Sequence, residues 1–275
     1  MIAQAFEYTA PKTLDEALEL LAEGAKPLSG GMSLIPMMKL RLAAPDHLVD
    51  LGRLKDLNYI LDAGGSLHIG ATTTHQQVAS SALVRAKCPL LAQAAAGVGD
   101  PQVRNRGTIG GSVAHADPSA DYPAALQALE AKFVLKGAKS ERTAAAADFF
   151  LDTFMTALEP GEIVREVIVP VEDAGTGTYY EKVVQKASGF AVVGIAVRIK
   201  KGWARVGVTG LSNHAYRALA VEKALEGGAD VQHAAAMVAE GVDANSDLHA
   251  SAEYRTHLAV VHAARAILAA MSRMA

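Results

Sequence analysis

The chain has 275 residues, of which 51% are hydrophobic and 20% charged, and its formal net charge at pH 7 is −3. This composition is that of a globular protein with enough length for a sizeable core, and it excludes a disordered chain. No basic stripe interleaved with aromatic residues occurs, which argues against nucleic-acid binding.

The chain is poor in metal ligands. Its single cysteine, Cys88, cannot form an intrachain disulfide or supply the four thiolates of an iron–sulfur cluster. The nine histidines show no paired spacing of the zinc type. We therefore expect no metal site in this chain, and any redox chemistry requires a bound organic cofactor.

The N-terminal residues 1–8 lack a basic region followed by an apolar run, so they do not form a signal peptide. No uncharged apolar stretch reaches the ~20 residues needed to span a bilayer. We therefore expect a cytoplasmic protein.

The first two thirds of the chain predict short strands alternating with helices. Thr13 is typical of a helix N-cap, with Glu16 at the capping-box position. Pro36 argues against a strand after residue 33 and favours a short helical turn or an irregular segment. Strands are expected at 6–8, 27–28, 47–51, 67–71, 132–135 and 163–169, and helices at 13–24, 74–84, 90–96 and 123–129.

The last third has a different character, because three strand-like segments precede the helices. The strands are expected at 179–186, 191–200 and 204–211, and the helices at 215–225, 231–240 and 252–271. This order is typical of an α+β domain. With boundaries near residues 55 and 177, we expect three parts, namely residues 1–55, 56–177 and 178–275.

A first diglycine segment, Ser29-Gly30-Gly31-Met32-Ser33, follows a short predicted strand. Adjacent glycines permit positive φ and close approach of a backbone or a ligand. Successive backbone N–H groups can then form a concavity that binds a phosphate, to which Ser33 adds a hydroxyl donor. The alternative is a plain tight turn.

A second diglycine segment, Thr108-Ile109-Gly110-Gly111-Ser112, is again rich in glycine and small hydroxyl residues. The run Asp117-Pro118-Ser119-Ala120-Asp121 follows it, and acidic side chains are natural partners for the hydroxyls of a ribose or ribityl chain. The same run also fits a helix N-terminal cap before Pro123, and both interpretations can hold together.

Other nucleotide-binding and hydrolytic motifs fail. Gly97-Val98-Gly99 lacks the third glycine of the dinucleotide fingerprint, and the expected βαβ frame is not evident. The chain has neither a phosphate-binding lysine loop nor a nucleophile elbow at a strand–helix turn.

Four segments carry a resemblance to a known family. Residues 27–42 and 104–121 closely resemble the two FAD segments of the medium subunits of aerobic carbon monoxide dehydrogenases, which are molybdenum hydroxylases related to xanthine dehydrogenase. Ala187–Gly194 resembles the stretch that presents an aromatic residue to the flavin, and Tyr254–Ala259 is similar to the family's C-terminal helix. The match is collinear over nearly the whole chain.

The resemblance implies a two-part FAD-binding fold of the vanillyl-alcohol-oxidase (PCMH) type, followed by a C-terminal three-stranded antiparallel sheet with helices. FAD would lie between the N-terminal and middle parts, with the two diglycine loops around its pyrophosphate. Asp121 would bind a hydroxyl, the strand at Ile163 the adenine end, and Phe190 the isoalloxazine. The expected FAD-binding residues are Lys26, Ser29, Gly30, Gly31, Met32, Ser33, Leu34, Thr108, Ile109, Gly110, Gly111, Ser112, His115, Asp121, Ile163 and Phe190.

Two of these positions depart from the family pattern. Many relatives have tyrosine where this chain has Phe190, so the hydrogen bond of a phenol is replaced by apolar packing and restriction of solvent. Met32 stands where relatives often have histidine or glutamine, which leaves the binding there to the backbone.

The resemblance also implies a function. The substrate would be oxidised at a molybdenum cofactor in a large partner subunit, and [2Fe-2S] clusters in a small subunit would pass electrons to FAD here. FAD would release them to a quinone or another acceptor, so no catalytic acid or base is expected in this chain.

The expected assembly is a dimer of heterotrimers, cytoplasmic or held at the inner face of the membrane through the complex. Carbon monoxide, an aldehyde, a purine and an N-heterocycle all stay open as its substrate. Two alternatives are a stand-alone FAD-dependent oxidoreductase of the same fold, for whose substrate domain the C-terminal part leaves little room, and a structural subunit without flavin.

Overall fold

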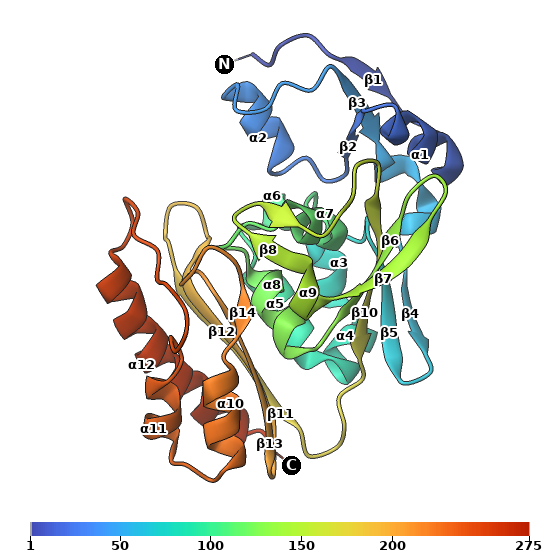
Figure 1. The fold of residues 1–275 in the computed structure, drawn as a ribbon. Coiled ribbons are helices and arrows are strands. Elements are labelled where there is room, and N and C mark those ends of the chain that lie inside the picture. The colour runs from blue at the N-terminus through green and yellow to red at the C-terminus, as the bar shows by residue number, and fades with distance from the viewer. Residues whose placement is uncertain (1, 275) are drawn as a thin grey trace.

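The computed structural model describes residues 2–274. The chain forms three successive parts, each with its own main sheet and its own buried apolar cluster (Figure 1). A small parallel sheet lies at the N-terminal end, a five-stranded antiparallel sheet lies in the middle, and a four-stranded antiparallel sheet is packed with the C-terminal helices. The mixture of helix and sheet agrees with the predicted α+β class.

The N-terminal sheet has the order β1-β3-β2 and is parallel throughout. Its elements are β1 (Glu7–Thr9), α1 (Leu14–Ala22), β2 (Lys26–Leu28), α2 (Leu34–Lys39) and β3 (His47–Asp50), followed by the 3-10 turns η1 (Leu51–Arg53) and η2 (Lys55–Leu57). Thr13 caps α1 as predicted, because its side chain accepts a hydrogen bond from the Glu16 N–H at 3.2 Å. The Glu16 carboxylate accepts from the Lys12 N–H, one residue before the position that a capping box requires.

The middle sheet has the order β4-β5-β10-β6-β7, with β10 at its centre. Its strands are β4 (Ile60–Ala63), β5 (Ser66–Gly70), β6 (Lys132–Lys136), β7 (Glu141–Ala145) and β10 (Ile163–Pro170). A separate hairpin joins β8 (Phe150–Asp152) to β9 (Met155–Thr156). The helices are α3 (His75–Ser80), α4 (Ala82–Lys87), α5 (Pro89–Gly97), α6 (Pro101–Arg104), α7 (Ile109–His115), α8 (Asp121–Ala128) and α9 (Ala146–Phe149).

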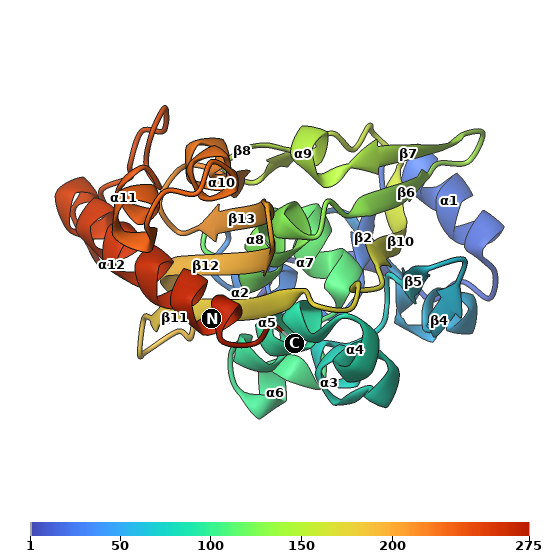
Figure 2. The same cartoon turned by 90° about the horizontal axis from the view of Figure 1, so that it is seen from below.

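The C-terminal sheet has the order β11-β12-β13-β14 and is antiparallel. Its strands are β11 (Gly177–Val184), β12 (Ala191–Lys200), β13 (Trp203–Thr209) and β14 (Tyr216–Arg217), and its helices are α10 (Leu219–Glu226), α11 (Val231–Ala236) and α12 (Ala252–Met271). Figure 2 shows α12 along one face of this sheet and α8 on the other. Residues 193–199 of β12 are therefore buried without alternation, as in a strand covered on both faces.

Four predictions need correction here. The C-terminal sheet has a fourth strand, β14, because Tyr216 and Arg217 pair with β13, and the helix expected from residue 215 begins only at Leu219. The helix expected at 74–84 is two helices, since Ser81 leaves the helical conformation and caps the second one. The helix expected from Pro123 begins at Asp121.

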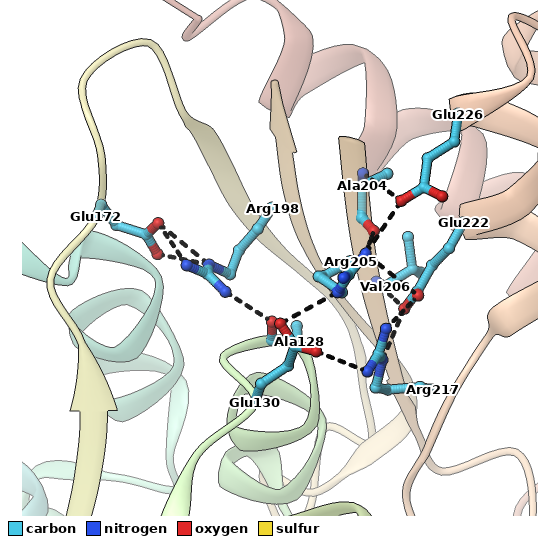
Figure 3. Close-up of polar contacts among 10 residues, drawn as sticks. All are labelled: Ala128, Glu130, Glu172, Arg198, Ala204, Arg205, Val206, Arg217, Glu222 and Glu226. Atoms are coloured by element: carbon cyan, nitrogen blue, oxygen red, sulfur yellow. Dashed lines mark hydrogen bonds and ion pairs between the residues drawn. The ribbon is translucent and has the colours of Figure 1, made fainter. Parts of the chain in front are cut away.

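Ion pairs join the middle part to the C-terminal sheet, and the pair between Arg198 and Glu172 is buried (Figure 3). Arg198 of β12 contacts Glu172 through its Nε at 2.8 Å and donates from Nη1 to the Ala128 carbonyl at the end of α8. Both charged side chains are only 8% exposed. Glu130 accepts from Arg217 at 2.9 Å in the neighbouring cluster of Figure 3. The two parts are thus held together by charge as well as by apolar packing.

Candidate functional site

The first diglycine segment is the turn that leads from β2 into α2. Gly31 has φ +75°, a left-handed conformation that glycine adopts at little cost. In residues 2–274, no group accepts a hydrogen bond from the backbone N–H groups of residues 30–34. Pro36 lies in the first turn of α2, where its missing N–H leaves no gap in the helix. Five successive N–H groups at a helix start suit a bound pyrophosphate.

The second diglycine segment is the start of a helix, which corrects the expected loop. Thr108 is the N-cap of α7, and its Oγ1 accepts from the Gly111 N–H at 3.2 Å. The Ile109 N–H donates to Thr73 at 3.0 Å, and the Gly110 N–H to Ala71 at 2.9 Å. Because these N–H groups already have acceptors, this segment can contact a ligand only through its side-chain hydroxyls and through its glycines, which allow close approach.

The structure brings the two diglycine segments into direct contact. Ser29 Oγ lies 2.9 Å from Thr108 Oγ1, within hydrogen-bond distance. A Cβ on Gly30 would lie 2.2 Å from the Arg106 carbonyl oxygen and 2.7 Å from the Gly107 Cα. Gly30 is therefore required for the close approach of the two backbones, and α2 faces α6 and α7 across this junction (Figure 1).

Lys26 and His115 contribute charge and an aromatic ring beside the junction. Lys26 begins β2 and is exposed, while His115 ends α7 half-buried with its ring centroid 4.9 Å from that of Phe154. Burial lowers the pKa of His115, and Lys26 lowers it further, while Asp117 opposes the shift. At neutral pH His115 is thus an uncharged donor and acceptor.

Asp121 has partners inside the chain, which the sequence did not reveal. Its carboxylate accepts from the Tyr180 hydroxyl at 2.7 Å and lies 2.8 Å from Lys182 Nζ. Lys182 also donates to the Gly97 carbonyl at 2.9 Å. The Asp121 and Lys182 side chains are 4% and 7% exposed, and burial raises the pKa of Asp121 although Lys182 opposes it. In this structure Asp121 fixes β11 to the start of α8.

Phe190 lies in the turn between β11 and β12 and is 42% exposed. It lines a cavity of about 200 Å³ together with Asp117, Ser119 and Arg255. The Ala191 N–H donates to the Ser119 carbonyl at 3.1 Å, so this turn is tied to the end of the second FAD segment. The aromatic face of Phe190 is therefore available to a planar ligand beside the Asp117–Asp121 loop.

The remaining predicted residues differ in accessibility. Met32 is 37% exposed, while Ser33 and Leu34 are half-buried at the start of α2. Ile163 is 4% exposed and packs in the N-terminal core beside Leu18 and Leu57, so its side chain is not free to contact an adenine.

The contacts of three further residues near the candidate site could not be predicted from motifs. Tyr180 and Lys182 lie on the same side of β11, and only the folded sheet brings them to Asp121. Arg255 belongs to the quoted segment Tyr254–Ala259, but its burial is visible only in the structure.

The described residues were also compared with what a metal site and a membrane-spanning helix require. Within residues 2–274, no group of three or more histidine, cysteine, aspartate and glutamate side chains is arranged to hold a metal ion. None of the helices in the described part of the chain combines the length and the apolar character that a membrane crossing needs.

Comparison with known families gives two matches that together span most of the chain. The model of the FAD binding domain in molybdopterin dehydrogenase matches residues 4–172. The model of the CO dehydrogenase flavoprotein C-terminal domain matches residues 178–270.

Individual relatives agree with these matches. The chain is 42% identical over 287 aligned positions to the carbon monoxide dehydrogenase medium chain of Hydrogenophaga pseudoflava, covering 100% of both. It is 39% identical to the glyceraldehyde dehydrogenase medium chain of Sulfolobus acidocaldarius, covering 93% of this chain and 95% of the relative. A solved structure of carbon monoxide dehydrogenase from Hydrogenophaga pseudoflava superposes with a TM-score of 0.96 at 45% identity, with 100% of each chain covered.

Proposed function

Because the chain belongs to the family of FAD-binding medium subunits of carbon monoxide dehydrogenase and related molybdenum hydroxylases, we propose that FAD lies between its two diglycine segments. The observation that carries this placement is the row of five free N–H groups at residues 30–34, directly beside the Ser29–Thr108 contact. Such a row meets the requirement of a pyrophosphate, which brings acceptors and negative charge but no donors.

The other residues take complementary roles in this proposal. Lys26 supplies positive charge near the pyrophosphate, and neutral His115 supplies a donor from the end of α7. Phe190 packs against the flavin ring and restricts solvent on that side. Asp121 acts chiefly through Lys182 and Tyr180, which hold the C-terminal sheet against the site. Bound FAD exchanges electrons singly or in pairs, and the protein's task is to bind and orient it.

The relatives are medium chains of multi-subunit dehydrogenases, so large and small partner subunits belong with this chain as well. We propose that the small subunit delivers electrons from [2Fe-2S] clusters and that FAD passes them to a quinone or another acceptor. The large subunit would bind the molybdenum cofactor and the substrate. The only cysteine of this chain, Cys88, is buried, and burial raises its pKa to about 12, which disfavours the thiolate that a cluster needs.

The complex is proposed to be a dimer of heterotrimers, which lies in the cytoplasm or is held at the inner face of the membrane through its other components. Mass measurement of the intact complex and fractionation of cells test these two statements. The chain itself is proposed to divide near residues 55 and 177, and limited proteolysis followed by mass spectrometry of the fragments tests that division.

The placement of FAD is tested by purifying the full chain and recording its absorbance spectrum with and without added FAD. We expect flavin bands in stoichiometric amount. A colourless protein that takes up no FAD would refute the proposal and would favour a structural subunit. Co-expression with the adjacent genes then tests the partners, and a flavoprotein that oxidises a substrate alone would favour the stand-alone alternative.

A further inference from the structure

Arg255 is a buried cation in an unfavourable place. It lies in the first turn of α12, only 3% exposed, near the helix end where the backbone dipole favours negative charge. Burying a guanidinium also costs solvation free energy, which its hydrogen bonds must offset. A residue in this position is poorly explained by the stability of α12 alone.

The contacts of Arg255 lead to three separate segments. Its Nη1 donates to the carbonyls of Val192 and Gly210, each at 2.6 Å, and its Nη2 donates to Asp247 at 2.6 Å. The planar guanidinium holds these acceptors in a fixed relation, which an ammonium group does less well. Arg255 therefore clamps the start of β12, the end of β13 and the segment that precedes α12.

Two of these segments touch the proposed flavin site directly. The Gly210 N–H donates to the Pro118 carbonyl at 2.7 Å, within the loop that ends the second FAD segment. Gly210 has φ +80°, and a Cβ there would lie 2.5 Å from the Val192 carbonyl oxygen, so the two clamped strands meet closely at this point. Val192 follows Phe190 by two residues, and Phe190, Asp117 and Arg255 line the same cavity.

We propose that Arg255 is a positioning residue for FAD: through Gly210 and Val192 it holds the Asp117–Asp121 loop and the Phe190 turn where the cofactor needs them. The inference rests on the proposed function and adds to it a residue on a helix that itself need not touch the flavin. The proposal also gives the C-terminal part a defined role, since Arg255 and its hydrogen-bond acceptors all belong to that part.

Arg198 provides a matched control, because it is also a buried arginine that binds a carboxylate and a backbone carbonyl, and it lies towards the other end of β12. It lies on β12 six residues after Val192, roughly 20 Å along the strand, and binds Glu172 and the last residue of α8 (Figure 3). Arg198→Met removes a comparable set of contacts away from the flavin segments. It therefore reports the general cost of losing a buried arginine in this sheet.

The experiment uses the full chain and compares wild type, Arg255→Met, Arg255→Lys and Arg198→Met. For each protein, FAD affinity is measured by flavin fluorescence titration, and the visible circular dichroism of the bound flavin and the melting temperature are recorded. We expect Arg255→Met to bind FAD about 10- to 100-fold more weakly, as for one or two lost charge-assisted hydrogen bonds, with altered flavin dichroism. Arg255→Lys should recover part of the affinity.

Arg198→Met should lower the melting temperature while keeping FAD affinity and flavin dichroism within about twofold of wild type. Equal FAD affinity in the Arg255→Met and Arg198→Met proteins would overturn the inference. If Arg255→Met does not fold, the Asp247→Asn variant tests the inference instead, because it removes the negative charge that pairs with Arg255 and leaves the two carbonyl acceptors in place. We expect it to weaken FAD about two- to fivefold, and wild-type affinity would count against the clamp. A wild-type chain without FAD affinity would instead refute the proposed function.

Discussion

The contact between the diglycine segments predicts a large effect of a single methyl group at Gly30. In Gly30→Ala the new Cβ would lie 2.2 Å from the Arg106 carbonyl oxygen, whereas such carbon–oxygen contacts normally lie near about 3.3 Å. The two segments must then separate by about 1 Å, which is incompatible with the 2.9 Å contact between Ser29 Oγ and Thr108 Oγ1. Because backbone atoms meet here, no flexible side chain can relieve the overlap.

The magnitude follows from the cost of overpacking, which is typically about 1–3 kcal/mol. If FAD requires the segments in their observed relation, this cost is taken from its binding free energy, so affinity should fall about 5- to 150-fold. Gly31→Ala should act differently, since its Cβ would meet side chains rather than backbone, the nearest being Ile35 at 2.8 Å, while its φ of +75° strains the backbone. That strain, about 1–2 kcal/mol, destabilises the fold with and without FAD.

The assay is a titration of flavin-free protein with FAD, followed by flavin fluorescence and paired with melting temperatures with and without FAD. Gly227→Ala is the matched control, because Gly227 has φ −77° and follows α10, which belongs to neither segment. A Cβ on Gly227 would lie 3.3 Å from its nearest neighbour, the Lys223 carbonyl oxygen. If Gly30→Ala binds FAD within twofold of wild type, the two segments do not form the site together, and the reasoning from their close approach is wrong.

Two further predictions concern buried titratable side chains. Lys182→Met leaves the Asp121 carboxylate buried without its cation and should destabilise the protein by about 3–5 kcal/mol at neutral pH. Because the loss of Lys182 raises the pKa of Asp121 further, the carboxyl group takes up a proton as the pH falls and the loss of stability should become smaller. A loss of stability that is independent of pH would contradict this. Burial lowers the pKa of His75 to about 4, so stability is lost as pH falls from about 6.5 towards 4, by roughly 3 kcal/mol. His75→Phe should abolish that loss in melting curves measured against pH, whereas the exposed control His257→Gln should retain it.

The sequence predicts elements well where the signal is local. The periodic apolar residues and cap of α1 and the long run of α12 determine those helices without reference to the rest of the chain. The short strands β4, β7, β8, β9 and β14 were not predicted, because two to five residues carry little periodicity of their own. Their partners, as with Tyr216 on β13, are supplied by the fold.

The second diglycine segment shows why a conformation expected from local composition can be wrong, because a loop was expected where the structure has the start of α7. Two glycines disfavour a helix interior, so a loop was the natural expectation. Here Gly110 lies in the first turn of α7, and a Cβ on it would be 2.4 Å from the Ala71 Cβ. The glycine is needed for packing against β5's end, a requirement that no local pattern announces.

The site was predicted as a set of segments rather than as a set of contacts. Both diglycine segments and the Phe190 turn could be located from motifs, because each is continuous in the chain. Tyr180 and Lys182, which contact Asp121, and the two carbonyl acceptors of Arg255 lie more than forty residues away along the chain, so these contacts depend on the register of the sheet. The sequence therefore predicts which segments form the candidate site, but it does not predict the contacts that hold these segments together.

The N-terminal core has a consequence for how the chain is made. Leu18, Leu21, Val49 and Leu57 emerge first from the ribosome, yet their cluster also contains Ile163 from β10, which follows only after most of the middle part. At about 5–20 residues per second, the N-terminal segment waits on the order of ten seconds for that side chain. A segment of about 60 residues buries too little apolar surface to be more than marginally stable by itself. The part of the protein that begins the proposed flavin site is thus completed late in synthesis, with its apolar face exposed in the meantime.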